Sequence, residues 1–399
     1  MKTYPSTAPV AAPTSKLGEL FRNNIRQYSM LIALIAIVLF FQVLTNGTLL
    51  QPLNITNLIL QNSYIVIMAL GMLLVIVAGH IDLSVGSVAA FVGAISATLI
   101  VSWNMNYIVA MVLCLLIGAL IGAWQGFWVA YMKIPSFIVT LAGMLIFRGL
   151  TLVLLQGQSI GPFPIEFQRL SSGFIPDIFS SEGLHLTTLL VGALLAAALI
   201  VLDVRARRNQ QRFKFETMPM YLFVIKNLAI TAAIMALCYL LASYNGLPNV
   251  LVVLFTLVAL YTFVTTQTVL GRRIYALGGN EKAAKLSGVH TARLTFYSFV
   301  NMSVLAALAG LIITARLNTA TPRAGTGFEL DVIAACFIGG ASAAGGIGTV
   351  IGAIIGAFVM GVMNNGMSII GVGIDWQQSI KGLVLLLAVF FDVYNKNKG

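Results

Sequence analysis

The sequence predicts an all-α protein that crosses a membrane many times. Of its 399 residues, 59% are hydrophobic and only 9% are charged. A soluble globular protein carries about 25% charged residues, so this composition excludes that class. Apolar runs of about 20 residues recur along the whole chain, and each is long enough to cross a bilayer as a helix. A membrane β-barrel would instead show alternating apolar and polar residues.

The apolar runs follow one another from the N-terminal region to the C-terminus. They fall at about 29–46, 63–79, 84–102, 107–131, 135–156, 186–204, 222–243, 249–268, 294–315, 329–345, 347–368 and 378–394. Because some of the last three can be half-spans, we expect ten to twelve transmembrane or half-membrane helices. The first run is too long for a signal peptide and lacks a clear cleavage site. We therefore expect a cytoplasmic tail at 1–28 and a transmembrane region at 29–395.

The basic residues predict the orientation of the chain. With the N-terminus inside the cell, 17 of the 23 Lys and Arg residues fall in inner segments, and only Arg169, Arg316 and Arg323 fall clearly outside. Cytoplasmic loops of membrane proteins carry such an excess of positive charge. The net charge of +11 therefore needs no nucleic acid partner to explain it. Both termini and the segment 269–293 are predicted to be cytoplasmic.

The sequence "GGNEKAAKLSGVHTAR" (278–293) is a polar segment between apolar runs. Asn280 can cap a short helix with its side-chain oxygen, and Gly288 can end that helix in the left-handed conformation. Glu281 lies at the positive end of the helix dipole, and Lys282 and Lys285 lie closer to its negative end. A helix of about two turns is marginal in water by itself. We therefore expect it to dock against a partner, although a solvated loop is the alternative. Ala283, Ala284 and Leu286 would supply the apolar docking surface.

Two charged residues interrupt apolar runs. Asp82, in "AGHIDLSVGSVAAFVGA" (78–94), either caps the following helix, with Leu83 and Ser84 in its first turn, or lines a polar path. We favour the cap. His80 and Asp82 alone do not make a metal site. Arg148 lies deep in an apolar run and should face the protein interior or a watery cavity.

The sequence "ELDVIAACFIGGASAAGGIGTVIGA" (329–353) begins with the acids Glu329 and Asp331 and continues with a Gly/Ala/Ser break. Broken helices at membrane depth are tolerated where they line a cavity. The glycines do not match a dinucleotide fingerprint, and the chain has no P-loop motif. No arrangement of catalytic or metal-ligating residues is visible either. The three cysteines lie in apolar runs, where we expect them to be buried.

Glycines recur at every fourth position in two passages, at Gly118, Gly122 and Gly126 and at Gly348, Gly352 and Gly356. Such stripes let two helix backbones approach closely. Because one stripe lies in each half of the chain, one interpretation is an internal duplication of the kind seen in transporters. Coincidence in a chain with 37 glycines is the alternative.

Four motifs in order resemble a known family, the permease subunits of bacterial monosaccharide ABC importers. This ribose, xylose and galactose group is related to the branched-chain amino acid permeases. The motifs cover most of residues 60–395 and read "GHIDLSVGSV", "PSFIVTLAGMLIFRG", "GRRIYALGGNEKAAKLSGV" and "ELDVIAACFIGGASAAGGIGTVIGA". The chain looks most similar to the longer xylose-type and multiple-monosaccharide permeases, with 186–243 as an insertion relative to ribose permeases.

The resemblance implies an ABC importer permease fold in the bacterial inner membrane. Two permease copies would form the path, two ATP-binding subunits would dock on the cytoplasmic side, and a periplasmic binding protein would deliver the sugar. ATP and Mg²⁺ would then be bound by the partner, and this chain would carry no cofactor. The segment 269–293 would couple to the ATPase through Gly278, Gly279, Asn280, Glu281, Ala283, Ala284, Leu286 and Gly288.

The sugar path is marked less clearly in the sequence. The candidates for a pathway or gate are Asp82, Ser84, Arg148, Glu329, Asp331, Asn364 and Asn365. Trp124, Gln125 and Trp128 are eligible by residue type, although tryptophan usually lies at the membrane interface. The alternative function is an ion-coupled secondary sugar transporter without an ATPase. That alternative would require several paired intramembrane ionisable residues.

Overall fold

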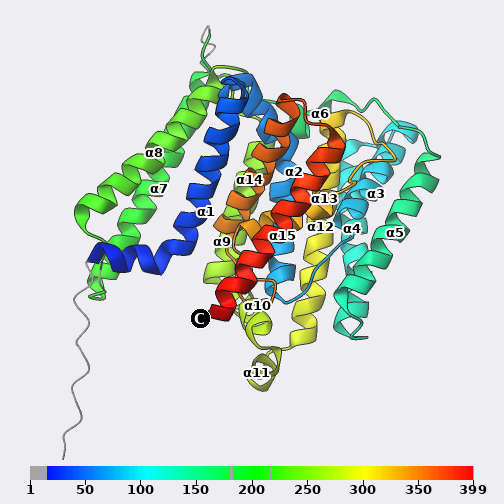
Figure 1. Cartoon of the computed structure of the whole chain (residues 1–399). Coiled ribbons are helices and arrows are strands. Elements are labelled where there is room, and N and C mark those ends of the chain that lie inside the picture. Colours follow the sequence, from blue (N-terminus) through cyan, green and yellow to red (C-terminus); the bar gives the residue numbers. More distant parts are fainter. Residues whose placement is uncertain (1–15, 180–182, 216, 399) are drawn as a thin grey trace, which may run out of the picture.

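The structure is a computed structural model that describes residues 16–179, 183–215 and 217–398. Within these ranges the chain is a bundle of fifteen α-helices and contains no β-strand (Figure 1). Nine of the described helices are long and apolar enough to cross a membrane. These observations confirm the predicted all-α polytopic class.

The helices follow the predicted apolar runs closely. They are α1 (Lys16–Leu44), α2 (Pro52–Val77), α3 (Val85–Ala97), α4 (Tyr107–Ala130), α5 (Ser136–Leu155), α6 (Ile165–Ser172), α7 (Leu186–Arg212), α8 (Met220–Ala242), α9 (Asn249–Gln267), α10 (Val269–Gly279), α11 (Glu281–Leu286), α12 (Thr291–Leu317), α13 (Phe328–Ile338), α14 (Val350–Ile369) and α15 (Ile374–Lys398). A 3-10 turn, Thr48–Leu50, precedes α2, and a π-helical turn, Thr98–Ser102, extends α3.

Side-chain caps fix where several helices begin. The side chains of Asn106, Thr268 and Thr349 accept hydrogen bonds from backbone amides in the first turns of α4, α10 and α14. Each cap satisfies one of the amides that a helix start leaves without a partner. Pro52 occupies the first turn of α2, where its missing amide costs nothing.

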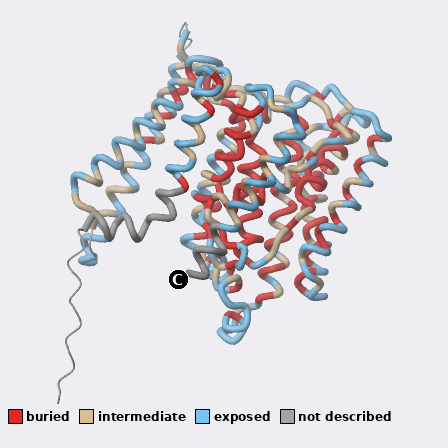
Figure 2. The backbone as a smooth tube through the Cα atoms, viewed as in Figure 1, coloured by how far each residue is buried: buried red, intermediate tan, exposed pale blue. Residues whose placement is uncertain are grey.

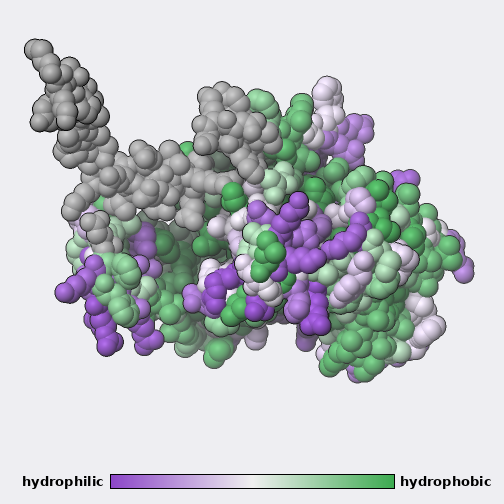
Figure 3. Space-filling model, turned by 90° about the horizontal axis from the view of Figure 1, so that it is seen from below, coloured by the Kyte–Doolittle hydropathy of each residue, from purple (hydrophilic) through white to green (hydrophobic). Residues whose placement is uncertain are grey.

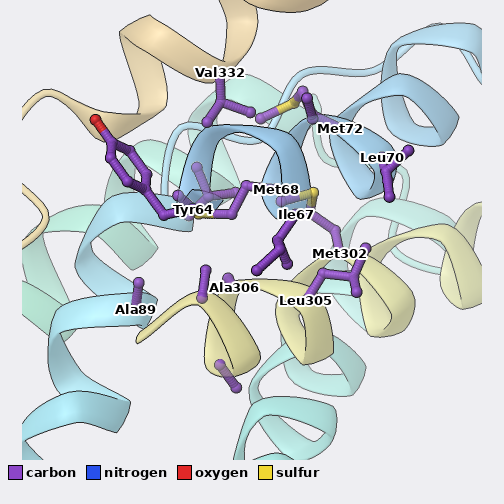
Figure 4. Close-up of a cluster of buried hydrophobic side chains, with 14 of the residues drawn as sticks. Tyr64, Ile67, Met68, Leu70, Met72, Ala89, Met302, Leu305, Ala306 and Val332 are labelled. Atoms are coloured by element: carbon purple, nitrogen blue, oxygen red, sulfur yellow. The ribbon is translucent and has the colours of Figure 1, made fainter. Parts of the chain in front are cut away.

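Helix α2 lies at the centre of the bundle. Every residue from Asn62 to Val77 is buried (Figure 2), which agrees with a helix that is apolar on all sides. Figure 4 shows Ile67 of α2 facing Met302 and Leu305 of α12 in one buried cluster. A Cβ at Gly71 would lie 2.8 Å from the Met302 sulfur and 3.3 Å from the Met302 Cα, so α2 and α12 approach closely at this glycine. The centre is therefore held by close packing.

The glycine stripe at Gly118, Gly122 and Gly126 has the predicted packing role. All three face α12, and a Cβ at Gly122 would lie 2.6 Å from the carbonyl oxygen of Phe299. Helix α4 can therefore lie directly against the α12 backbone only because these positions lack side chains.

The second stripe is only partly as predicted. A Cβ at Gly352 would lie 2.1 Å from Gly339 O, and one at Gly356 would lie 1.9 Å from Ala335 O, so both glycines let α14 approach α13. Gly348 is not part of this helical stripe, because α14 begins at Val350. The predicted internal duplication is tested by neither stripe and stays a prediction.

Helices α7 and α8 form a hairpin at one edge of the bundle (Figure 1). Only 22% and 17% of their most apolar stretches are buried, against 89% for α2, so most of their side chains face outward. An ion pair between Lys226 and Asp203 and the stacking of Arg207 over Phe223 join the two helices. The hairpin corresponds to the predicted insertion at 186–243, whose status as an insertion stays a prediction.

The predicted break after Asp331 is present. Helix α13 ends at Ile338, and turns and irregular chain lead to α14 at Val350. This irregular stretch reaches the end of the bundle that carries α11, where the amide of Gly346 donates to Val77 O at 2.8 Å. Non-helical backbone is therefore held inside the bundle, as expected for a broken helix.

Candidate functional site

A polar cavity of about 560 Å³ lies among α2, α12, α13, α14 and α15. Its lining includes Tyr64, Arg316, Asp331, Asn364 and Lys381. The cavity has the size of a small-molecule site, which usually spans about 300–1,000 Å³.

Asp331 is the centre of the hydrogen bonding in this cavity. Its side chain is almost fully buried in the first turn of α13. Lys381 Nζ lies 3.0 Å from Oδ1, while Tyr64 Oη and Asn364 Nδ2 donate to Oδ2 at 3.2 and 3.1 Å. A buried carboxylate requires such a countercharge and hydrogen-bond donors. The four side chains join α2, α13, α14 and α15 at one point.

The sequence identified only two of these four residues, Asp331 and Asn364. Lys381 was missed, although a lone lysine in the apolar run 378–394 is the signal that could have found it. Tyr64 stacks on Phe328 with ring centroids 3.9 Å apart, and nothing in its local sequence marks that role. Asn365, the neighbour of Asn364, was expected in the pathway. It exchanges hydrogen bonds with Asn54 between α2 and α14 and does not line the cavity, and its role in a pathway stays a prediction.

Glu329 lines the cavity beside α3, whereas Arg148 on α5 is not among the lining residues. Arg148 Nη1 donates to Ala324 O at 2.5 Å, so its guanidinium faces the protein, as predicted for an arginine in an apolar run. The Glu329 carboxylate packs against the first turn of α3, where a Cβ at Gly86 would lie 2.5 Å from Glu329 Oε2. Among the described residues Glu329 Oε2 has no hydrogen-bond partner.

Asp82 does not cap α3, so the favoured prediction was wrong. The helix begins at Val85, and Asp82 Oδ1 instead accepts hydrogen bonds from the amide and hydroxyl of Ser84 at 2.8 and 2.6 Å. The carboxylate therefore closes a tight turn before the helix, an arrangement common for aspartate. Gln125 Nε2 donates to the Ser84 hydroxyl at 2.7 Å, which makes a second buried polar group. Among the described residues no hydrogen bond joins this group to the Asp331 group.

The two tryptophans considered for sugar binding lie elsewhere. Trp124 and Trp128 are 40% and 37% exposed on α4, and neither lines the cavity. Their exposure agrees with an interfacial or lipid-facing position.

The predicted helix in the polar segment is present as α11. Asn280 Oδ1 accepts from the amide of Ala283 at 3.0 Å, and Gly288 has φ +81°, which confirms the cap and the left-handed stop. The helix projects from one end of the bundle (Figure 1). Seen from that end, hydrophilic residues gather near the middle of the face, with hydrophobic residues around them (Figure 3).

The expected apolar docking surface of α11 needs one correction. Leu286 is 90% exposed and Ala283 is exposed, but Ala284 is buried against its own chain. Ala284 therefore anchors α11, while Leu286 is free to contact a partner. Lys133, in the α4–α5 connection, lies 3.8 Å from the Glu281 carboxylate in an exposed ion pair.

The glycines at the end of α10 place this segment directly against the core. A Cβ at Gly278 would lie 1.6 Å from Val77 O, whereas one at Gly279 would have no atom within 4 Å. Tyr275 Oη also donates to Gly348 O at 2.7 Å. Helix α10 therefore contacts both the end of α2 and the chain between α13 and α14.

The cysteine and histidine side chains lie apart from the cavity in the described part of the chain. All three cysteines are buried and free, as expected. Among the described residues no cluster of three or more His, Cys, Asp or Glu side chains occurs. The pKa of His80, at the end of α2, is lowered by burial, and Thr295 is its hydrogen-bonding neighbour at 3.4 Å.

Comparison with known proteins gives matches over nearly the whole chain. Residues 54–389 match the family described as the branched-chain amino acid transport system permease component. The xylose transport system permease protein of Escherichia coli is 40% identical over 403 residues, which cover 100% of this chain and 99% of that one. The corresponding protein of Haemophilus influenzae is 40% identical over 375 residues, 94% of this chain and 98% of that one.

A ribose permease is also similar. The ribose import permease protein of Escherichia coli is 35% identical over 341 residues, 85% of each chain. No solved structure gives a significant match. The helical bundle with its projecting α10–α11 segment and the match over residues 54–389 lead to one conclusion: the chain is a permease component that belongs to the branched-chain amino acid transport system permease family.

Proposed function

We propose that this chain is the membrane permease subunit of an ATP-driven importer and forms the path for a monosaccharide. The observation that carries the proposal is the 40% identity to a xylose permease along the full chain, supported by 35% identity to a ribose permease. Xylose, or several pentoses and hexoses, is the proposed cargo. The chain itself binds no nucleotide in this proposal.

The proposed partners are a second copy of the chain, two ATP-binding subunits and a periplasmic sugar-binding protein. The end of the bundle with α11 would face the cytoplasm of a bacterial cell, with both termini on that side. The basic side chains in the C-terminal part of α7 and those of α10 and α11 support this orientation. The exposed Leu286 would enter a groove of the ATP-binding subunit.

Two contacts support a route by which a docked partner would act on the path. Gly278 lies against the last carbonyl of α2, and Tyr64 of the same helix donates to Asp331 in the cavity. Nucleotide-driven closure of the ATP-binding subunits would displace α11 and α10, and α2 would carry the displacement toward the cavity. Binding energy in the partner would then change access to the polar cavity.

One observation favours the alternative of an ion-coupled transporter. The buried ion pair between Asp331 and Lys381 is the kind of intramembrane pair that such transporters use. The pair also has a structural explanation, because it fastens α15 to α13. We therefore keep the ATP-driven importer as the proposal and let the experiment decide.

The test is reconstitution in liposomes with the ATP-binding subunit and the binding protein, with radiolabelled xylose as cargo. We expect uptake that requires ATP inside the liposomes and resists protonophores and sodium ionophores. Competition with arabinose, ribose, glucose and galactose would then define the cargo. Uphill uptake by the chain alone on an ion gradient would refute the proposal.

A further inference from the structure

Resting on the proposed function, we propose that the cavity around Asp331 is the site at which the permease itself contacts the sugar hydroxyls. Asn364, Tyr64 and Asp331 are the proposed contact residues, with Phe328 beside them. The site would add a second selection step after the binding protein has released its sugar.

The charges around the cavity suit a neutral polar cargo. The lining contains two basic side chains, Arg316 and Lys381, and two acidic ones, Glu329 and Asp331. Lys381 and Asp331 already neutralise each other at 3.0 Å. An ionic ligand would therefore meet no net countercharge, whereas a polyhydroxylated molecule could exchange hydrogen bonds with both signs of charge.

Asn364 provides a hydrogen-bonding atom that the protein leaves unused. Its Nδ2 donates to Asp331, which fixes the orientation of the amide, and its Oδ1 is buried without a partner among the described residues. A buried acceptor without a donor is costly, so such atoms usually meet a water or a ligand. A sugar hydroxyl in the cavity would supply the missing donor.

The aromatic pair supplies an apolar surface against which the C–H face of a sugar ring can pack. Tyr64 and Phe328 both line the cavity and stack on each other with an interplanar angle of 24°. The Tyr64 hydroxyl donates to the same Asp331 oxygen as Asn364 does. An amide that can hydrogen-bond a hydroxyl, Asn364, thus lies beside the aromatic side chains of Tyr64 and Phe328 in one buried place.

The experiment measures selectivity in the reconstituted complex with the same binding protein in every sample. Uptake of the parent sugar is compared with that of its mono-deoxy analogues, each of which lacks one hydroxyl. A site that hydrogen-bonds a hydroxyl discriminates against the analogue without it. Because the contribution of the binding protein is constant, a changed ratio between variants must arise in the permease.

We expect Asn364→Ala to reduce the discrimination against one deoxy analogue by on the order of tenfold, the effect of one lost hydrogen bond. Tyr64→Phe keeps the ring and should change the discrimination at one position as well. Asn365→Ala is the matched control: it removes the neighbouring amide, which bonds Asn54 outside the cavity, and should leave the ratios unchanged.

The experiment distinguishes failure of the proposed sugar site from failure of the proposed importer function. If the unsubstituted complex imports the sugar and both Asn364→Ala and Tyr64→Phe keep all ratios, the cavity is not the sugar site and the importer proposal stands. If the unsubstituted complex imports no monosaccharide, the proposed function fails and the site fails with it.

Discussion

The amide of Gly346 donates a hydrogen bond to the carbonyl oxygen of Val77 at 2.8 Å, which joins the chain between α13 and α14 to the last turn of the central helix. Gly278 of α10 lies against the same carbonyl. Three segments far apart in the sequence therefore meet around one backbone oxygen at the base of the projecting α11.

This junction predicts opposite outcomes for two adjacent glycines. Gly278→Ala would place a Cβ 1.6 Å from Val77 O, so α10 must shift, and we expect transport to fall at least tenfold. Gly279→Ala meets no atom of the chain within 4 Å, so it should keep much more transport than Gly278→Ala, and any remaining loss would arise at the ATP-binding subunit. Uptake rates at equal membrane levels, measured with the reconstituted complex, check the pair. Equal activity of both variants would show that the contact does not matter.

Leu286→Asp should uncouple the permease from its ATP-binding partner without affecting its own fold. Leu286 is 90% exposed, so the substitution removes no internal contact. We expect normal membrane insertion, loss of co-purification with the ATP-binding subunit and loss of uptake. Ile178→Asp is the matched control: this aliphatic residue is 77% exposed in the connection between α6 and α7, and its substitution should keep the association. Full association and transport in Leu286→Asp would contradict the docking role.

The Asp331–Lys381 pair predicts an asymmetry in stability. Lys381→Met leaves a buried carboxylate without its countercharge and should lower the free energy of unfolding by about 3 kcal/mol. The double variant Lys381→Met with Asp331→Asn removes both charges and should recover much of that loss. Thermal unfolding in detergent measures both. A double variant no more stable than the single one would argue against charge pairing as the cause.

The α4–α12 contact predicts that a glycine-to-alanine substitution lowers stability at one helical position and raises it at another. A Cβ at Gly122 would lie 2.6 Å from both Phe299 O and Val300 Cα, so Gly122→Ala should separate the helices and lower the melting temperature. Gly149 on α5 has no atom within 4 Å of its Cβ position. Gly149→Ala should raise stability slightly, by about 0.5–1 kcal/mol, because alanine restricts the unfolded chain more.

Burial of His80 predicts a stability loss in mild acid. Burial lowers the pKa of His80 below its ordinary value of 6.5, the nearby Lys133 lowers it further, and Glu281 partly opposes the shift. As the pH falls below about 6.5, the unfolded chain takes up the proton first, so the free energy of unfolding decreases. The melting temperature of His80→Gln should change less between pH 7 and about 5 than that of the parent protein. His290→Gln, at the same end of the bundle, is the control and should keep the parent dependence on pH. An unchanged pH profile in His80→Gln would assign the loss to another group.

The sequence predicted the features that arise from local patterns. Apolar run length located the spans, and Asn280 and Gly288 located the ends of α11, because capping and left-handed glycine act within a few residues. The role of Gly122 was also readable, since the stripe follows the helical period.

Features that depend on tertiary contacts were not predicted. Lys381 lies 50 residues from Asp331 on another helix, so only the folded bundle shows the pair. Asp82 was assigned as a helix cap because the local pattern of a turn before a helix is nearly the same. Ala284 and Leu286 are both apolar residues of one short helix, and only the packing of α11 on its own chain separates anchor from contact.

The enclosure of α2 has a mechanical consequence. From Tyr64 to Val77 the helix is surrounded on every side, and its 13-residue rise corresponds to about 20 Å. A close-packed interior has low compressibility, so we expect this stretch of α2 to move as a rigid body and not to shorten or bend. We therefore expect a displacement of the α2 end at Val77 to move Tyr64 as well, by sliding or rotation of the whole segment. The size of the movement at Tyr64 would follow from the geometry of a rigid helix.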